Sequence, residues 1–262
     1  MSHIDNFVLL SGLILNHKFA KIKRFHKFDL QKMYSSDLVL ILFEKAPTPI
    51  LKYVVDNAVD LQAPDEDKWR PIHYAIRYGR PEIAIYVINK GVDLECITAS
   101  SKTPLHFALK YDKPEVAQVL MARNVNLEGI DCDGWKPIHL ALRYSSPETV
   151  QYLLNSKVDL ETKTNDGWKP IHMAIRYADD ETAQRIIDAG TDTEAADNDN
   201  WRPIHYAILY GGPGTIDKLI NKGVDLRAPT KSGQQPLDIA RRFGSPDLIH
   251  HLEPLLEWII SY

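Results

Sequence analysis

The sequence predicts an all-α solenoid built from stacked two-helix units, and three observations predict it. A phrase of proline, an aliphatic residue, histidine, a variable residue and alanine recurs every 33 residues. Apolar residues follow each proline at helical spacing, and in most copies a second proline stands ten residues later. A fixed period of this length is typical of a unit that cannot bury its own apolar face and must stack on copies of itself. The phrase begins at Pro71, Pro104, Pro137, Pro170 and Pro203, with a weaker copy at Pro236.

The first helix of each unit is predicted to begin at the repeated proline. A proline ring fixes φ and lacks an N–H, which loses nothing in the first turn of a helix. Ile72, Ala75 and Ile76 then follow at helical spacing, so one side of the helix is apolar. We expect this helix to be short, with its successive copies ending near Gly79, Asp112 and Ser145.

A second helix follows in each unit and is predicted to carry its own apolar stripe. Ile83, Val87 and Ile88 form that stripe in one copy. Glutamate follows three of the opening prolines, where the helix N-terminus favours negative charge. The opening prolines are Pro81, Pro114, Pro147 and Pro213. Glycines that favour a left-handed C-terminal cap stand at Gly91, Gly190 and Gly223.

The ends of the array differ from its middle. Residues 50–61 match the second helix one period upstream of residues 83–94, which indicates a degenerate repeat before the first clear one. The predicted single domain, 1–262, comprises a degenerate N-terminal cap (1–35), a degenerate repeat (36–66), six repeats (67–252) and a C-terminal capping helix (253–262).

The phrase and its period together resemble the ankyrin repeat, whose signature is Thr-Pro-Leu-His-x-Ala at the same interval. Residues 103–108 match that signature directly, and residues 67–252 carry the resemblance. The resemblance implies a unit made of a β-turn followed by two antiparallel helices. It also implies that the stack binds other proteins along a concave face and through its turn tips. The predicted fold class is therefore an ankyrin-repeat solenoid with β-turn tips.

Composition and charge favour an intracellular protein, and the expected compartment is the cytoplasm. A net charge of −4 and a pI near 6.2 give no general case for nucleic acid. Cys96 and Cys132 show no metal or redox spacing and are expected to be reduced. The apolar run 7–15 lacks a cationic lead, which favours a capping helix over a signal peptide. The basic run Lys18 to Lys32 is interpreted as the solvated side of a terminal helix, with membrane or nucleic-acid binding the less favoured alternative.

The repeated histidines are interpreted as structural. Equivalent positions in neighbouring units lie about 8–10 Å apart, the distance between packed helices. One zinc ion needs ligands at about 2 Å, so the array cannot close on a metal. The resemblance implies instead that each histidine steadies its turn through hydrogen bonds. The cluster at residues 211–214 reads as a turn because no phosphate-loop lysine follows it. No catalytic motif is present, so we expect no enzyme activity, cofactor or small-molecule substrate.

The departures from the family pattern identify the candidate binding residues. The threonine before the proline is replaced by a cation in four units, and a tryptophan precedes each of these cations. The end of the first helix carries a tyrosine, preceded by a cation in four units. Stacking in register is expected to draw these positions into two parallel ribbons. The candidate protein-binding residues are Trp69, Arg77, Tyr78, Lys110, Tyr111, Trp135, Arg143, Tyr144, Trp168, Arg176, Tyr177, Trp201 and Tyr210.

Two interpretations of these ribbons stay open, and they are compatible. On the first interpretation each tryptophan serves the array itself by stacking on a neighbouring cation. Alternatively the ribbons bind a partner, because Trp, Tyr and Arg are the residues most enriched in interface hot spots. On the second interpretation Trp168→Ala weakens partner binding but costs little stability, since turn tips bury little core. Acidic residues just before the turns, from Asp65 to Asp199, indicate a partner of mixed charge.

The predicted function is a non-enzymatic protein–protein interaction scaffold that acts as a monomer on a partner of unknown identity. The alternative is a substrate-recognition adaptor for an enzyme carried on another chain or domain. Co-purification with a ligase, kinase or protease would separate the two.

Overall fold

The computed structural model describes residues 43–57, 60–244, 246, 249–250 and 252. The predicted N-terminal cap, the apolar run 7–15, the basic run Lys18 to Lys32 and the capping helix 253–262 lie outside the described residues. In the described part every regular element is a helix, as the repeat pattern predicts. The chain divides into two compact units, Met1–Cys132 (unit 1) and Asp133–Tyr262 (unit 2).

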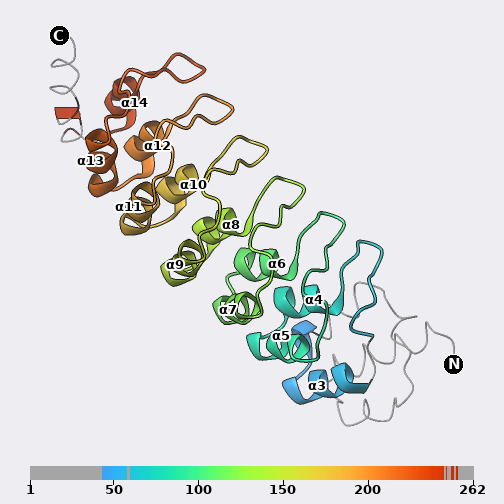
Figure 1. Ribbon diagram of the computed structural model, residues 1–262. Helices are drawn as coiled ribbons and strands as arrows, with labels where there is room; N and C mark the ends of the chain where they lie inside the picture. Colours follow the sequence, from blue (N-terminus) through green and yellow to red (C-terminus); the bar gives the residue numbers. More distant parts are fainter. Residues whose placement is uncertain (1–42, 58–59, 245, 247–248, 251, 253–262) are drawn as a thin grey trace. The chain divides into compact units, whose positions relative to one another are not determined.

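Unit 1 contains two clear repeats and part of the degenerate one. The first helices of the repeats pack on each other, and so do the second helices. The degenerate repeat contributes one helix, which packs on the second helix of the repeat that follows (Figure 1). The helices are α3 (Thr48–Asn57), α4 (Pro71–Tyr78), α5 (Pro81–Ile88), α6 (Pro104–Lys110) and α7 (Pro114–Ala122).

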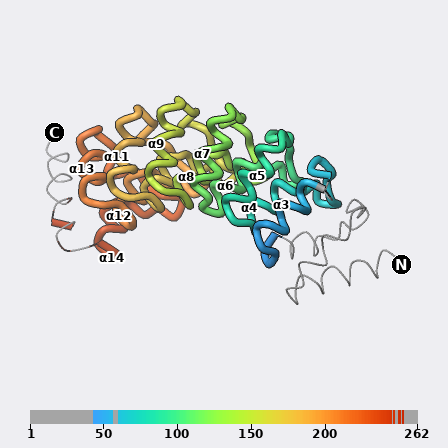
Figure 2. The backbone as a smooth tube through the Cα atoms, turned by 90° about the horizontal axis from the view of Figure 1, so that it is seen from below, coloured from blue at the N-terminus to red at the C-terminus, as the bar shows by residue number. Residues whose placement is uncertain are grey.

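Unit 2 repeats the same arrangement. Its first helices α8, α10, α12 and α14 pack in series, and α11 packs on α13. Figure 2 shows α12 and α14 on one side of this unit, with α11 and α13 on the other. The helices are α8 (Pro137–Tyr144), α9 (Pro147–Asn155), α10 (Pro170–Tyr177), α11 (Asp180–Asp188), α12 (Pro203–Tyr210), α13 (Pro213–Asn221) and α14 (Pro236–Phe243).

The helix boundaries confirm the predictions from proline and glycine. Every predicted opening proline occupies the first position of its helix. Gly91 and Gly190 have φ of +77° and +86°, the left-handed conformation expected at a C-terminal cap. Asn124 and Lys157 adopt the same conformation at the equivalent positions without a glycine. Helix α11, which lacks the proline, is capped by Asp179, whose side chain accepts a hydrogen bond from the Thr182 N–H.

A tight turn precedes each first helix and is closed by its own side chain. In one turn the Thr164 hydroxyl accepts a hydrogen bond from the N–H of Trp168, four residues later. Asp197 does the same for Trp201 through its Oδ1 atom. Successive turns within a unit are joined by one backbone hydrogen bond, which we call a rung. Unit 2 has rungs from Asn165 N to Asp133 O, from Asn198 N to Asp166 O and from Lys231 N to Asp199 O, and its turns project to the same side (Figure 1).

The core of each unit runs along the first helices. In the five clear copies of the phrase the alanine is fully buried, and so is the aliphatic residue three positions before it. Because a methyl group is all that fits, the facing helices can approach closely at this position. The fully buried alanines are Ala75, Ala108, Ala141, Ala174 and Ala207.

Leucine at Ala174 should overpack this column. We expect Ala174→Leu to lower the free energy of unfolding by about 1–3 kcal/mol, because α8 and α12 both pack on α10 and leave no room. Denaturant titration measures the change. The control is Ala122→Leu at the exposed end of α7, where the same enlargement should cost less than about 0.5 kcal/mol. Equal losses in the two variants would place the core face elsewhere.

Candidate protein-interaction surface

The repeated histidines cap the first helices from inside the stack. His172 Nδ1 accepts a hydrogen bond from the backbone N–H of Lys169 at 2.9 Å, and its Nε2 lies 2.9 Å from the Ala195 carbonyl oxygen. One nitrogen therefore accepts while the other donates, which is the pattern of a neutral imidazole. Burial lowers the pKa of His73 to about 4 and also lowers the pKa of His172. The structural interpretation of these histidines is confirmed, and no cluster able to hold a metal occurs among the described residues.

The cations next to the tryptophans are paired with carboxylates. Arg70 Nη1 lies 2.9 Å from an Asp93 oxygen, and Lys136 Nζ lies 3.1 Å from an Asp159 oxygen. Each acid comes from the segment that leads out of the same repeat's second helix, 23 residues after its cation. Lys169 and Arg202 each pair with such an acid, Asp192 and Asp225, and also with a glutamate eight residues before the cation, Glu161 and Glu194. Loop carboxylates therefore hold the cations that stand next to the tryptophans.

The tryptophans stack instead on arginines from the ends of the first helices. In unit 1, Arg77 Cζ lies 5.4 Å from the Trp69 ring centroid, 4.8 Å from that of Tyr78 and 5.2 Å from that of Tyr111. The two predicted ribbons thus merge into one array of alternating guanidinium groups and rings. We call this set the unit 1 ladder.

Unit 2 carries a longer array of the same kind, which we call the unit 2 ladder. Arg143 contacts the rings of Trp135, Tyr144 and Tyr177, with Cζ 4.8–5.5 Å from their centroids. Arg176 contacts Trp168, Tyr177 and Tyr210 at 4.9–5.3 Å. Tyr177 is shared, so each guanidinium group bridges its own repeat to the next one in the unit.

The ladder arginines differ from the cations that precede the repeated prolines in having no counter-charge within the described part of the chain. Among the described residues, no carboxylate forms an ion pair with Arg77, Arg143 or Arg176. Each guanidinium group lies over ring faces. A guanidinium that stacks on a ring through its flat side keeps its N–H edge available. The adjacent tyrosines Tyr144 and Tyr210 are 37% and 50% exposed, so the ladder reaches solvent.

The tryptophans also pack on the following repeat. The Trp69 ring lies 4.7 Å from Phe107 and the Trp168 ring lies 4.9 Å from Tyr206, both edge to face. These tryptophans are half-buried, so the premise that turn tips bury little core is wrong for Trp168. Substitution of Trp168 would therefore change both the stability of the fold and the surface offered to a partner. The arginines are therefore the cleaner positions at which to test binding.

Part of the acidic series before the turns is structural. The Tyr206 hydroxyl donates a hydrogen bond of 2.5 Å to Asp197, and Tyr74 makes the equivalent bond to Asp65. Burial raises the pKa of both tyrosines, with these carboxylates as a further cause. The two aspartates therefore close their turns and hold a core tyrosine, and they are not available to a partner.

The repeat that lacks tryptophan is organised around a buried ion pair that the sequence did not reveal. Lys102 stands at the tryptophan position, and its Nζ lies 3.1 Å from an Asp131 oxygen of the next turn. The two side chains are only 16% and 2% exposed. Two features of the sequence could have indicated this pair. Lysine replaces tryptophan at position 102, and the turn aspartate Asp131 is followed nine residues later by Leu140, where the other turn aspartates are followed by a tyrosine.

Removal of the lysine should leave a buried charge. We expect Lys102→Met to lower the free energy of unfolding by about 2–3 kcal/mol, because Asp131 loses its cation in a site with little access to water. Thermal or denaturant unfolding measures the loss. Adding Asp131→Thr, the residue found at this turn position in three other repeats, should recover most of it. No recovery would mean that the pair contributes little.

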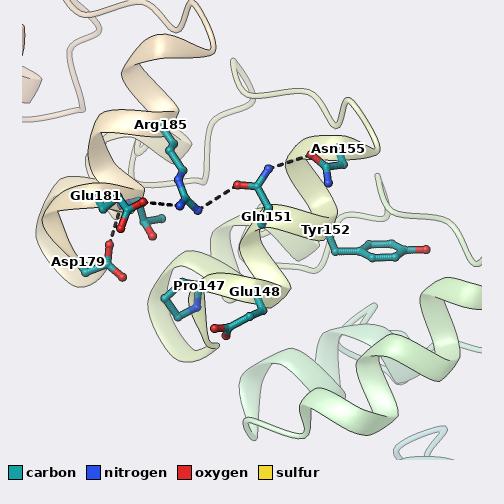
Figure 3. A pocket seen from close by; sticks show the side chains of 9 residues that line it. Pro147, Glu148, Gln151, Tyr152, Asn155, Asp179, Glu181 and Arg185 are labelled. Carbon is teal, nitrogen blue, oxygen red and sulfur yellow. Dashed lines mark hydrogen bonds and ion pairs between the residues drawn. The ribbon is translucent and has the colours of Figure 1, made fainter.

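A concave site that the sequence did not predict lies between α9 and α11 (Figure 3). It encloses about 550 Å³ and is lined mainly by polar side chains. Arg185 donates to Gln151 at 3.0 Å and to Glu181, and Gln151 in turn donates to Asn155 at 2.8 Å. Tyr152 points away from this network in Figure 3. These polar groups form hydrogen bonds with one another, so the site offers a partner less unpaired charge than the ladders do.

Comparisons with known proteins agree with this architecture. A family model described as "Ankyrin repeats (3 copies)" matches residues 37–128, 86–164, 124–197, 145–230 and 171–253. Among solved structures, the ankyrin repeat domain of Bcl-3, a member of the IkappaB protein family, is similar with 20% identity and a TM-score of 0.62. That match covers 82% of this chain and 96% of the other. No curated protein sequence matches significantly.

Within the described residues no helix is both long enough and apolar enough to cross a membrane. The repeated phrase, the paired helices and the family match over most of the sequence agree, and the chain belongs to the ankyrin-repeat family.

Proposed function

We propose that this chain is a non-enzymatic scaffold that binds a protein partner through the arginine–aromatic ladders of its two units. Ankyrin repeats are a general protein–protein interaction module, which supports the class of function. The observation that carries the choice of surface is the absence of a carboxylate partner for Arg77, Arg143 and Arg176 among the described residues. The cations that precede the repeated prolines, Arg70, Lys136, Lys169 and Arg202, are each paired with a carboxylate.

Ring stacking prepares these arginines for binding. A guanidinium group fixed between ring faces has little conformational freedom left to lose, so a partner carboxylate meets preorganised donors. A carboxylate can accept two parallel hydrogen bonds from the N–H edge, which is stronger than a bond between neutral groups. Exposed tyrosine and half-buried tryptophan supply apolar contact beside this charge.

The acidic turn residues restrict the partner to one of mixed charge. Glu66, Asp67 and Asp199 are exposed close to the ladders. A uniformly anionic polymer would be repelled there, which favours a protein segment over nucleic acid. We infer a monomer in the cytoplasm, because the two cysteines, Cys96 and Cys132, show no metal or redox spacing and fit a reducing compartment.

Substitution of a ladder arginine tests the proposal. A partner is first recovered with the full chain as bait and purified, and its Kd is then measured by calorimetry. We expect Arg176→Gln to raise Kd roughly thirtyfold, about 2 kcal/mol, because a desolvated hot-spot arginine would be lost. The variant should still fold, since the Arg176 side chain lies over the rings of Trp168 and Tyr210 and is not part of the core.

The matched control is Arg227→Gln, which removes the same charge from an exposed arginine of unit 2 outside the ladder. It should leave Kd within about twofold. A partner whose affinity is unchanged by Arg77→Gln, Arg143→Gln and Arg176→Gln alike would show that the ladders are not the binding surface.

A further inference from the structure

Unit 1 contains a small pocket beside its ladder, at the repeat where Lys102 replaces tryptophan. It encloses about 170 Å³. It is lined by four rings and three cations, together with Ser100. The rings are those of Trp69, His106, Phe107 and Tyr111, and the cations are Arg77, Lys102 and Lys110. A water molecule takes about 30 Å³ of liquid volume, so the space suits a side chain better than a single water.

The cations of the pocket differ in how they are neutralised. Lys102 is paired with Asp131. Arg77 lies against rings. Neither Arg77 nor Lys110 has a carboxylate partner among the described residues. In unit 2 the position of Lys110 is taken by Arg176, which stacks on the tryptophan of its own repeat. Lys110 has no such ring in its repeat, because Lys102 stands there.

The ring walls strengthen whatever charge interaction the pocket makes. Aromatic surfaces exclude water and lower the local dielectric constant, so an anion placed between Arg77 and Lys110 would be attracted more strongly than on an open surface. An aliphatic stem next to that anion would also bury apolar area against Phe107 and Tyr111.

We propose that this pocket accepts the side chain of a glutamate carried on an extended segment of the protein partner. The carboxylate binds the N–H edge of Arg77 and the ammonium group of Lys110, and the methylene groups lie on the rings. A phosphate group fits less well, since the third cation of the pocket, Lys102, is already paired with Asp131 and cannot balance a second negative charge. This inference rests on the proposed function, because the occupant is part of the partner.

The test uses a displayed library of short linear peptides selected on the full chain. Peptides that bind the natural sequence are screened again on a variant with Arg77→Gln and Lys110→Gln. We expect those lost in the second screen to share a glutamate. Changing that glutamate to glutamine should weaken binding to the natural chain by about tenfold, and to the variant by less than about twofold. This double-mutant cycle attributes the coupling to the pocket.

A second variant fills the pocket while keeping every buried charge balanced. Lys102→Trp combined with Asp131→Thr reproduces the residue combination of Trp69 with Thr98 and of Trp135 with Thr164, in which the threonine belongs to the next turn. Its thermal midpoint should be at least that of the natural chain, and it should fail to bind the glutamate peptides. Retained binding by a folded variant would overturn the inference.

Other outcomes are equally decisive. Failure to enrich any peptide dependent on Arg77 and Lys110, or enrichment without an acidic residue, would overturn the pocket assignment. Tighter binding when phosphoserine replaces the glutamate would overturn the choice of a carboxylate. Peptides that ignore the pocket but lose affinity with Arg176→Gln would refute this inference alone. Peptides indifferent to every ladder arginine would refute the proposed function as well.

Discussion

Lowering the pH from 7 to about 4.5 should reduce the free energy of unfolding by roughly 2–3 kcal/mol through His73 alone. The pKa of this histidine falls from 6.5 to about 4 on folding, with burial as the largest cause. Between these two values the unfolded chain binds a proton that the folded chain excludes. Stability is therefore full above pH 6.5, declines as the pH falls below it, and levels off below about 4.

His172 and His205 act in the same direction, because burial lowers the pKa of each. The carboxylates contribute in a different window. Asp180 and Asp192 have lowered pKa values in the folded state, so their contribution persists at pH 4.5 and is lost only as the pH falls below their ordinary value of 3.8. The loss between pH 6.5 and 4.5 is thus assigned to the histidines.

Denaturant titrations at several pH values measure this slope. His73→Gln is the informative variant. It should be less stable at pH 7, because the cap of α4 is altered, yet its stability should fall less between pH 6.5 and 4.5. A slope equal to that of the natural chain would mean that His73 takes up its proton without unfolding.

Truncation of a core leucine in unit 2 should have an effect of similar size. Leu153 lies on α9 and is fully buried, and we expect Leu153→Ala to cost about 2–5 kcal/mol through lost burial and a residual cavity. Leu154 is the next residue and is only half-buried, so Leu154→Ala makes the same chemical change and should cost clearly less. Equal costs would contradict the assigned core face.

Hydrogen exchange shows where the damage from Leu153→Ala appears. Contacts in a stack reach mainly adjacent repeats, so protection should fall first in α8 and α9, then in α10, and last in α14. A uniform loss across unit 2 would indicate that this unit unfolds as one block.

Local features of the fold were predictable, whereas side-chain partners were not. Prolines and glycines set the helix ends through their own backbone preferences, so Pro81 and Gly91 could be interpreted without any neighbour. The partner of Trp69 depends on competition between two cations, Arg70 and Arg77. Asp93 decides that competition by pairing with Arg70, and it lies 23 residues further along the chain.

The Lys102 repeat illustrates the same limit. The replacement of tryptophan was visible in the sequence, but its meaning depends on Asp131 in the next turn. The distance between them is set by how one repeat rests on another, which spacing within a repeat does not specify. The candidate site was therefore predicted by residue type, while its division into paired and unpaired cations required the structure.

The contacts between repeats join fixed positions, and this bears on how such an array changes length. A glutamate side chain accepts a bond from a backbone N–H 31 residues later in several repeats, among them Glu161 to Asp192 and Glu194 to Asp225. The rungs of unit 2 likewise recur at a constant spacing along the sequence. A 33-residue segment such as 164–196 therefore carries one complete set of donors and acceptors wherever it is cut. Unequal recombination can duplicate or delete such a segment and restore every bond at the new junction, while a gain or loss of one residue would break them all.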